Sequence, residues 1–211
     1  MKLYLTPLSH FSRKVVIVAT ELGLEFERKY VPDLLSNDPQ DFGGNPILRV
    51  PVWEDGEDWI LESDAIVGFL IDRYGGGDRL GYRGLSSPQR NALSLLNAIM
   101  AAEVELVLSA RSGCKRNAFF VRYEYVIERS LGWLEQHGEA IWTSTPFSYL
   151  DVVLVCMWDH LQHSGVLPVL PSCRWIGRRV RSFDIRPNVR ESSPVQMQDL
   201  QWQLYPSQGP S

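Results

Sequence analysis

The stretch RVPVWEDGEDWILESDAI, from Arg49 to Ile66, decides the fold of this chain. Asp55-Gly56 is a good short-range turn signal, and the residues on its two sides are predicted to form two antiparallel strands joined by that tight turn. A helix is predicted to follow directly. Glu62 and Ser63 stand where the second strand passes into that helix, so a carboxylate, a hydroxyl and helix N–H groups meet at one place. Such a junction suits a small anion or zwitterion.

The Val50-Pro51 pair enters the first of these strands. A residue before proline is held extended, so the backbone groups of Val50 are placed to pair with a peptide-like ligand. The bond between the two residues is also where a cis peptide bond is expected.

The first 74 residues predict a small mixed sheet with helices packed on it. The order is β-α-β followed by β-β-α, which differs from a Rossmann fold. A loop with at most a short helix is expected between Pro32 and Pro46, because turn-forming residues crowd this segment. The expected elements are strands at Lys2–Leu5 and Glu25–Val31, the hairpin at Val52–Leu61, and helices at Phe11–Leu22 and Ser63–Tyr74.

The segment from Gly75 to Pro88 is interpreted as a linker, and every long segment after it is predicted to be helical. Ser148-x-x-Asp151 is a capping-box pattern at the start of an almost wholly apolar helix, which predicts the central helix of a second domain. The tail from Glu191 is expected to be loosely held. Two domains are therefore predicted, residues 1–78 and 86–211. The expected helices are Gln89–Ala110, Phe119–Gln136 ending near Gly138, Tyr149–His163 and Ser172–Asp184.

Composition and charge argue against several classes of protein. A chain of 211 residues suits two small domains, and 45% hydrophobic with 22% charged residues argues against global disorder. The net charge of -4 gives no support to a nucleic-acid partner. No apolar run approaches the roughly 18 residues of a membrane span, so no membrane association is predicted. Three cysteines without a CxxC pair, zinc-like spacing or a signal peptide indicate a reducing, cytoplasmic setting.

Several of these segments resemble the cytosolic glutathione transferases. LYLTPLSHFSRKVVIVATELGL, NPILRVP and the Glu62-Ser63 junction are similar to the N-terminal, thioredoxin-like domain of that family, and LSHFSRKV resembles its theta-like and zeta-like members. PFSYLDVVLVCMW and SFDIRPNVRES resemble the family's capped central helix and closing turn, so the resemblance covers nearly the whole chain. It implies the glutathione transferase fold, an α/β thioredoxin-like N-terminal domain plus an all-α C-terminal helical domain.

The resemblance implies that Ser9 is the catalytic residue, since a serine at this position stabilises the glutathione thiolate in the theta-like and zeta-like enzymes. A free thiol has a pKa near ~8.5, and lowering it by two units requires about 2.7 kcal/mol of preferential thiolate stabilisation. One hydroxyl aimed at the sulfur, together with a helix N-terminus, is of the right size to supply it. The alternative is that Ser9, Ser12 or Thr6 caps the helix, and spacing alone favours Ser12 as the cap.

The resemblance also implies the residues that bind glutathione. Val50, before a cis Pro51, would pair with the backbone of the glutathione cysteine, and Glu62-Ser63 would hold the γ-glutamyl amino and carboxylate groups. Arg49 falls where the family often has Lys or Gln, so it is a candidate for the glycine carboxylate, with a plain exposed arginine as the equal alternative. Leu48 departs from the family, in which glycine is commoner.

A second-substrate pocket is implied at Leu8, His10 and Phe11, with the set Met100, Val104 and Leu108 facing them. Those three are spaced as residues on one helix face, and residues spaced in this way belong more often to a core than to a pocket. His10 is interpreted as a loop neighbour because no carboxylate partner is evident for a catalytic base. The span from Ser164 to Trp175 is a further candidate for shaping this pocket.

The function predicted from the sequence is that of a glutathione transferase, in which a serine-stabilised glutathione thiolate attacks a small, largely apolar electrophile. Glutathione is the expected co-substrate, and neither a metal nor a nucleotide cofactor is implied. One alternative is glutathione-dependent isomerisation, as in the zeta-like maleylacetoacetate isomerases, whose Ser-Ser-Cys run is replaced here by Leu8-Ser9-His10-Phe11. The other alternative is a binding or regulatory protein without turnover. Cysteine-based thiol transfer is not expected, because neither Ser9 nor its neighbours are cysteine.

A closed symmetric homodimer is also expected, with each first domain against the partner's helical domain. Glu103 and Glu105 are then candidates for reaching the neighbour's γ-glutamyl amino group, with an exposed helix-face carboxylate as the favoured alternative. The basic run RWIGRRVRSFDIR is interpreted as a solvated helix face rather than a polyanion site.

Overall fold

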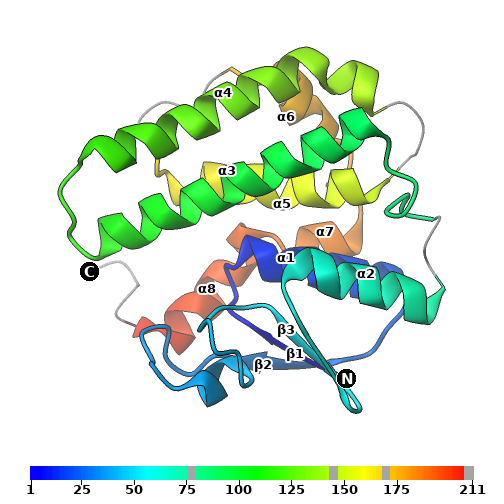
Figure 1. Ribbon diagram of the computed structural model, residues 1–211, viewed down its shortest axis with the longest axis vertical. Coiled ribbons are helices and arrows are strands. Elements are labelled where there is room, and N and C mark those ends of the chain that lie inside the picture. Colours follow the sequence, from blue (N-terminus) through cyan, green and yellow to red (C-terminus); the bar gives the residue numbers. More distant parts are fainter. Residues whose placement is uncertain (76–78, 143–146, 168–171, 207–211) are drawn as a thin grey trace. The chain divides into compact units, whose positions relative to one another are not determined.

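The structure is a computed structural model that describes residues 1–75, 79–142, 147–167 and 172–206 (Figure 1). Contacts divide the chain into an N-terminal unit, Met1–Gly77 with Arg186–Ser211, and a helical unit, Asp78–Ile185. The boundary near residue 78 is close to the predicted one. The segment from Arg186 onward, however, groups with the N-terminal unit and not with the helices that precede it.

The N-terminal unit is built on a four-stranded mixed sheet in the order β2-β1-β3-β4. Strand β1 (Lys2–Leu5) pairs in parallel with β2 (Glu27–Tyr30) and antiparallel with β3 (Val52–Asp55), which forms a hairpin with β4 (Asp58–Leu61). A parallel pair needs a crossover connection, and α1 (His10–Glu21) supplies it. The hairpin is followed by α2 (Ser63–Tyr74), so the predicted element order is confirmed.

The core of this unit lies where the sheet meets α1 and α2. Leu3 and Leu5 alternate with half-buried residues along β1, as expected when one face of a strand is covered. Each fully buried aliphatic side chain of this kind contributes about 1.5–3 kcal/mol of hydrophobic stabilisation. The buried cluster consists of Leu3, Leu5, Val15, Val16, Ala19, Trp53, Ile66 and Leu70.

The loop before β3 contains the short 3-10 helix η1 (Pro39–Phe42), in agreement with the predicted loop with at most a short helix. Gly43 follows it with φ at +65°, and a Cβ at this position would lie 2.6 Å from the ring of Tyr4. The indole N–H of Trp59 donates to the Gly43 carbonyl at 2.7 Å. Glycine is required here both by the left-handed conformation and by the close approach of the tyrosine ring.

The C-terminal segment is firmly attached, so the prediction of a loosely held tail from Glu191 is wrong for the residues up to 206. It forms α7 (Pro187–Glu191) and α8 (Pro194–Leu204), and the Tyr205 hydroxyl donates to the Val31 carbonyl. The guanidinium of Arg13, almost fully buried on α1, donates to the Ser192 hydroxyl at 3.1 Å and to the Val189 carbonyl at 2.9 Å. These bonds join residues more than 170 positions apart, which local sequence patterns do not encode. The tail residues 207–211 lie outside the described residues.

The helical unit contains α3 (Ser87–Arg111), α4 (Ala118–Ile141), α5 (Tyr149–Ser164) and α6 (Arg174–Arg181). Helix α3 packs along α4 and α5, and α6 packs on α4 and α5 (Figure 1). Ten consecutive residues of α5, Tyr149–Trp158, are buried, which confirms it as the central helix.

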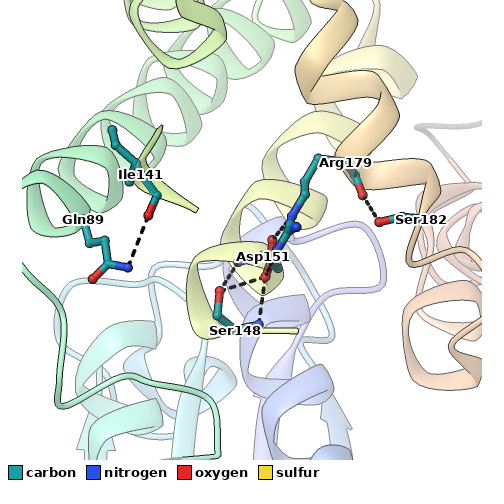
Figure 2. A network of polar contacts seen from close by, with 6 residues as sticks. All are labelled: Gln89, Ile141, Ser148, Asp151, Arg179 and Ser182. Carbon is teal, nitrogen blue, oxygen red and sulfur yellow. Dashed lines mark hydrogen bonds and ion pairs between the residues drawn. The ribbon is translucent and has the colours of Figure 1, made fainter. Parts of the chain in front are cut away.

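The start of α5 carries the predicted capping box (Figure 2). The Ser148 hydroxyl oxygen accepts from the Asp151 N–H, while the Asp151 carboxylate accepts from the Ser148 N–H and O–H at 2.8 Å each. Arg179 of α6 adds two bonds to the same buried carboxylate, at 2.8 and 3.0 Å. The helix start and the α5–α6 contact are therefore fixed by one carboxylate.

Gly138 does not end α4, contrary to the prediction, because the helix continues to Ile141. A Cβ on Gly138 would lie 2.3 Å from the Trp175 ring, so the glycine makes room for an indole that arrives from α6. The carboxylate of Glu135, one turn earlier, accepts from the N–H groups of Trp175 and Ile176 at 2.7 and 3.0 Å. Glu135 thus satisfies donors at the start of α6.

Helix α3 is long and apolar enough to cross a membrane, by length and composition alone, although no apolar run of that length was predicted from the sequence. Core helices of globular proteins pass the same test, and α3 packs against two other helices. One such helix is weak support for a membrane span. Of its most apolar window, 39% is buried, so apolar side chains also line its exposed face.

Candidate functional site

Ser9 is the N-cap of α1, which corrects the expectation that Ser12 caps this helix. Its backbone is extended, and its hydroxyl oxygen accepts from the Ser12 N–H at 3.1 Å. Ser12 is the third residue inside the helix and is almost fully buried. A cap at Ser12 would place the first helical residue at Arg13, but the helix begins three residues earlier, at His10.

The Ser9 hydroxyl is arranged as a donor. A hydroxyl accepts at two lone pairs and donates one hydrogen. The Ser9 oxygen accepts from the Ser12 N–H and from the Ser12 O–H, the latter at 3.0 Å. After these two bonds, the Ser9 hydroxyl can still donate its own hydrogen. A hydrogen-bond donor is the group needed to stabilise an anion beside the start of α1.

Ser9 and Ser12 also line a small cavity of about 20 Å³ inside the N-terminal unit. This volume is enough for about one water molecule, and its lining includes both polar and apolar residues. Its lining consists of Leu5, Thr6, Pro7, Ser9, Ser12, Arg13, Val16, Arg28, Ser192 and Met197.

The Val50-Pro51 bond is cis, as predicted. The loop before it is held by Asn45, a buried side chain whose amide donates to the Arg49 carbonyl at 2.7 Å and whose oxygen accepts from the Ile47 N–H at 3.0 Å. Leu48 has φ at +53°, the left-handed region that favours glycine. The departure of this chain from the family at Leu48 therefore falls at the position where glycine has a conformational advantage.

Glu62 and Ser63 mark the start of α2, as predicted, with Glu62 as the N-cap. One Glu62 carboxylate oxygen accepts from the N–H groups of Asp64 and Ala65 at 3.0 and 3.3 Å. The other accepts from the Ser63 hydroxyl at 3.1 Å. Glu62 itself is exposed, whereas Ser63 is buried.

This geometry refines the expectation that open helix N–H groups would receive an anion. Glu62 already occupies two of them, so the exposed edge of its carboxylate is the natural partner for a ligand ammonium group. A ligand carboxylate would have to take over the Ser63 hydroxyl from Glu62, since a hydroxyl has one hydrogen to donate. The two residues therefore suit the two charges of a zwitterion.

A buried ion pair connects the two helix starts. The ammonium of Lys14, fully buried on α1, lies 2.7 Å from the carboxylate of Asp64, the residue after Ser63. This ion pair was not predicted from the sequence. The available signal was a lysine directly before the apolar run Val15–Ala19, at a position that the helix buries.

The remaining predicted site residues are distributed over both units. His10 begins α1, and its ring is tilted by 38° to that of Phe11, with the ring centroids 4.8 Å apart. The Leu8 N–H donates to the side-chain oxygen of Gln201 at 3.4 Å. On α3 of the helical unit, the three predicted pocket residues differ in exposure: Met100 is buried, Val104 is intermediate and Leu108 is exposed. Arg49 is exposed. The second-substrate pocket stays a prediction, and part of the Ser164–Trp175 span, 168–171, lies outside the described residues.

Glu103 is not the exposed helix-face carboxylate that was the favoured expectation. It is fully buried in the helical unit, where one carboxylate oxygen accepts from the Ser164 hydroxyl at 2.7 Å and lies 2.8 Å from Nδ1 of His160. A carboxylate held in this way is not an exposed helix-face group. Glu105 is the remaining candidate for a contact with a neighbouring chain.

Comparison with known proteins bears on the fold of the chain. Residues 8–73 match the family model described as the glutathione S-transferase N-terminal domain. A glutathione S-transferase from Methylobacterium radiotolerans, solved with glutathione sulfonate, superposes with a TM-score of 0.76 at 22% identity, over 92% of this chain and 94% of that one. The chain has the glutathione transferase fold.

Two further structures support the same fold. A glutathione S-transferase from Methylobacillus flagellatus with bound glutathione has a TM-score of 0.75 at 21% identity, covering 92% of this chain and 98% of that chain. The maleylacetoacetate isomerase from Methylobacterium extorquens AM1, with malonate and glutathione, has a TM-score of 0.72 at 19% identity, covering 93% and 97%. At these identities the likeness establishes the fold alone, and residues 8–73 are similar to the N-terminal domain of the glutathione S-transferases.

Proposed function

We propose that the N-terminal unit binds glutathione and that the Ser9 hydroxyl stabilises its thiolate for attack on a small, largely apolar electrophile. The observation that carries this proposal is the hydrogen bonding of Ser9, whose oxygen accepts twice from Ser12. Its own hydrogen is left to donate toward a ligand. One such hydrogen bond to a charged group is worth about 1.5–3 kcal/mol, enough to lower a thiol pKa by about one to two units.

Glutathione binding is supported by the groups that surround this hydroxyl in the N-terminal unit. The Glu62-Ser63 pair suits the amino and carboxylate ends of the γ-glutamyl group, and Val50 offers its backbone beside the cis Pro51. Arg49, exposed in the same loop, is proposed to meet the glycine carboxylate. Similar structures hold glutathione or its sulfonate, which agrees with this assignment.

The chemical step requires few protein groups. A thiolate is the nucleophilic form of the thiol, and holding it beside the electrophile turns a bimolecular reaction into an effectively unimolecular one. Leu8, His10 and Phe11 are proposed to form one side of the pocket for the electrophile. Ser9 contributes by raising the fraction of thiolate at neutral pH.

Glutathione-dependent isomerisation is the second candidate, and the likeness to a maleylacetoacetate isomerase favours it. In that reaction the thiolate adds to a double bond and is later expelled, so glutathione is not consumed. The same Ser9 arrangement serves both reactions. A glutathione-binding protein without turnover is the third candidate.

These functions are tested by calorimetry with glutathione, followed by activity assays of the full chain with glutathione, one set with electrophiles and one set with cis-enone acids. Saturable binding together with consumption of glutathione and an electrophile is the result expected of a transferase. Isomerisation of a cis-enone acid without net loss of glutathione would favour the isomerase. Glutathione binding without turnover of electrophiles or of cis-enone acids would identify a binding protein. Absence of glutathione binding would contradict the proposal.

We also propose that two chains form a symmetric dimer through the exposed apolar side of α3 and α4. Leu108, Phe119 and Tyr125 are each more than half exposed. A depression of about 410 Å³, lined by five residues between Ala118 and Tyr125, lies at the start of α4. A second copy would cover these side chains. Sedimentation at micromolar concentration should give the mass of two chains, and a monomeric mass would contradict the dimer.

A further inference from the structure

We propose that Ser12 is a positioning residue whose hydroxyl orients and polarises the Ser9 hydroxyl for thiolate stabilisation. This inference rests on the proposed function, because it assigns Ser12 a part in the same site. It reverses the expectation that Ser12 is only the cap of α1.

The geometry at the helix start supports this role. In a capping box, the side chain of the third helical residue bonds back to the N–H of the cap residue. Here the Ser9 N–H donates to the Thr6 carbonyl at 3.1 Å, so that donor is already satisfied. The Ser12 hydroxyl instead donates to the Ser9 hydroxyl oxygen at 3.0 Å.

The second bond changes what Ser9 can do. Its oxygen would accept the Ser12 N–H in any capped helix, but the Ser12 O–H fills the other lone pair. With both lone pairs used, Ser9 is fixed as a donor toward its ligand. A hydroxyl that accepts hydrogen bonds is also a stronger donor, by roughly 10–30% per bond.

Burial makes the arrangement persistent. Ser12 is only 1% exposed, so its hydroxyl is shielded from bulk water, which would otherwise compete for the hydrogen. Helix propensity does not explain a serine at position 12, because alanine is the better helix former at an interior position. The contact with Ser9 gives the hydroxyl at this position a function.

Four variants of the full chain test the inference: Ser12→Ala, Ser12→Thr, Ser9→Ala, and Ser9→Ala with Ser12→Ala. The measured quantity is the pKa of glutathione bound to each, from thiolate absorbance against pH. Ser12→Ala should raise that pKa by about half a unit, between wild type and Ser9→Ala. Ser12→Thr keeps the hydroxyl, so it should keep the wild-type value.

The double variant separates action through Ser9 from an independent effect. Since Ser12 acts through Ser9, adding Ser12→Ala to Ser9→Ala should leave the bound thiol pKa unchanged. An additive shift in the double variant, or no shift in Ser12→Ala while Ser9→Ala does shift, would overturn the inference and leave the proposed function intact. If Ser9→Ala itself shifts nothing, the proposed role of Ser9 fails and that of Ser12 fails with it.

Discussion

The buried ammonium of Lys14 lies 2.7 Å from the carboxylate of Asp64, and it ties the helix capped by Ser9 to the helix that begins at Ser63. The two partners are unequally buried: the Lys14 side chain is 0% exposed and that of Asp64 is 22% exposed. Asp64 also stands in the first turn of α2, where a negative charge is favourable. Removing the Asp64 carboxylate should therefore affect the stability of the fold differently from removing the Lys14 ammonium.

We predict that Asp64→Asn destabilises the fold by about 3–5 kcal/mol, because it deprives a buried ammonium of its carboxylate. Lys14→Met should cost only about 1 kcal/mol, since it leaves a partly exposed carboxylate at a helix start. Urea denaturation of both variants and of the double variant measures this, and the double variant should resemble Lys14→Met. Equal costs for the two single variants would mean that the burial asymmetry does not govern this pair.

Gly138 offers a prediction whose sign is opposite to helix propensity. Replacing a mid-helix glycine by alanine normally stabilises by about 0.5–1 kcal/mol. At Gly138 the added Cβ would lie 2.3 Å from the Trp175 ring, so Gly138→Ala should instead destabilise by about 1–3 kcal/mol. Gly132→Ala is the matched control on the same helix, with nothing within 4 Å of its Cβ, and should stabilise. A stabilising Gly138→Ala would refute the close packing of Trp175.

Tyr205 should make stability depend on alkaline pH. Burial, the largest cause, raises the pKa of Tyr205 to about 12 from its ordinary value of 10.0. The folded state then keeps the phenol protonated while the unfolded chain ionises, so this contribution is complete below pH 10 and is lost as pH rises toward 12.

Tyr205→Phe removes both the titration and the hydrogen bond to the Val31 carbonyl. At neutral pH it should cost about 1–3 kcal/mol, because a buried acceptor loses its donor. Between pH 10 and 12, the variant's unfolding free energy should fall less steeply than that of wild type. Parallel slopes for the two proteins would show that Tyr205 does not titrate with folding.

Ser63→Ala should weaken glutathione binding by about 1–3 kcal/mol, through loss of a charge-assisted hydrogen bond to the ligand carboxylate. The fold should change little, because Glu62 keeps its bonds to the Asp64 and Ala65 N–H groups. Calorimetry measures the dissociation constant, with Ser94→Ala, an exposed serine of α3, as the control. An unchanged constant for Ser63→Ala would remove Ser63 from the site.

Local chemistry accounts for what the sequence predicted well. The capping pair Ser148 and Asp151, the Glu62-Ser63 helix start and the turn at Asp55-Gly56 are each specified by residues within a few positions. The cis bond at Val50-Pro51 was predicted from a proline and its neighbours.

The missed features depend on residues far apart in the chain. Gly138 was misread as a helix end because its partner, Trp175, lies on another helix. The Lys14–Asp64 pair spans 50 positions, and Tyr205 is anchored to Val31 across 174. The capping role was misassigned to Ser12 because the cap is the residue directly before the helix, and the helix begins at His10, three residues earlier than a cap at Ser12 requires.

The most direct test of the account measures the pKa of glutathione bound to the wild-type chain and to Ser9→Ala, from thiolate absorbance against pH. In wild type we expect the thiol pKa to fall about two units below its free value of ~8.5. In Ser9→Ala it should rise by about one to two units with glutathione still bound, alongside a loss of about 1 kcal/mol in stability from the missing cap. Identical titration curves for the two proteins would contradict the claim that Ser9 stabilises the thiolate.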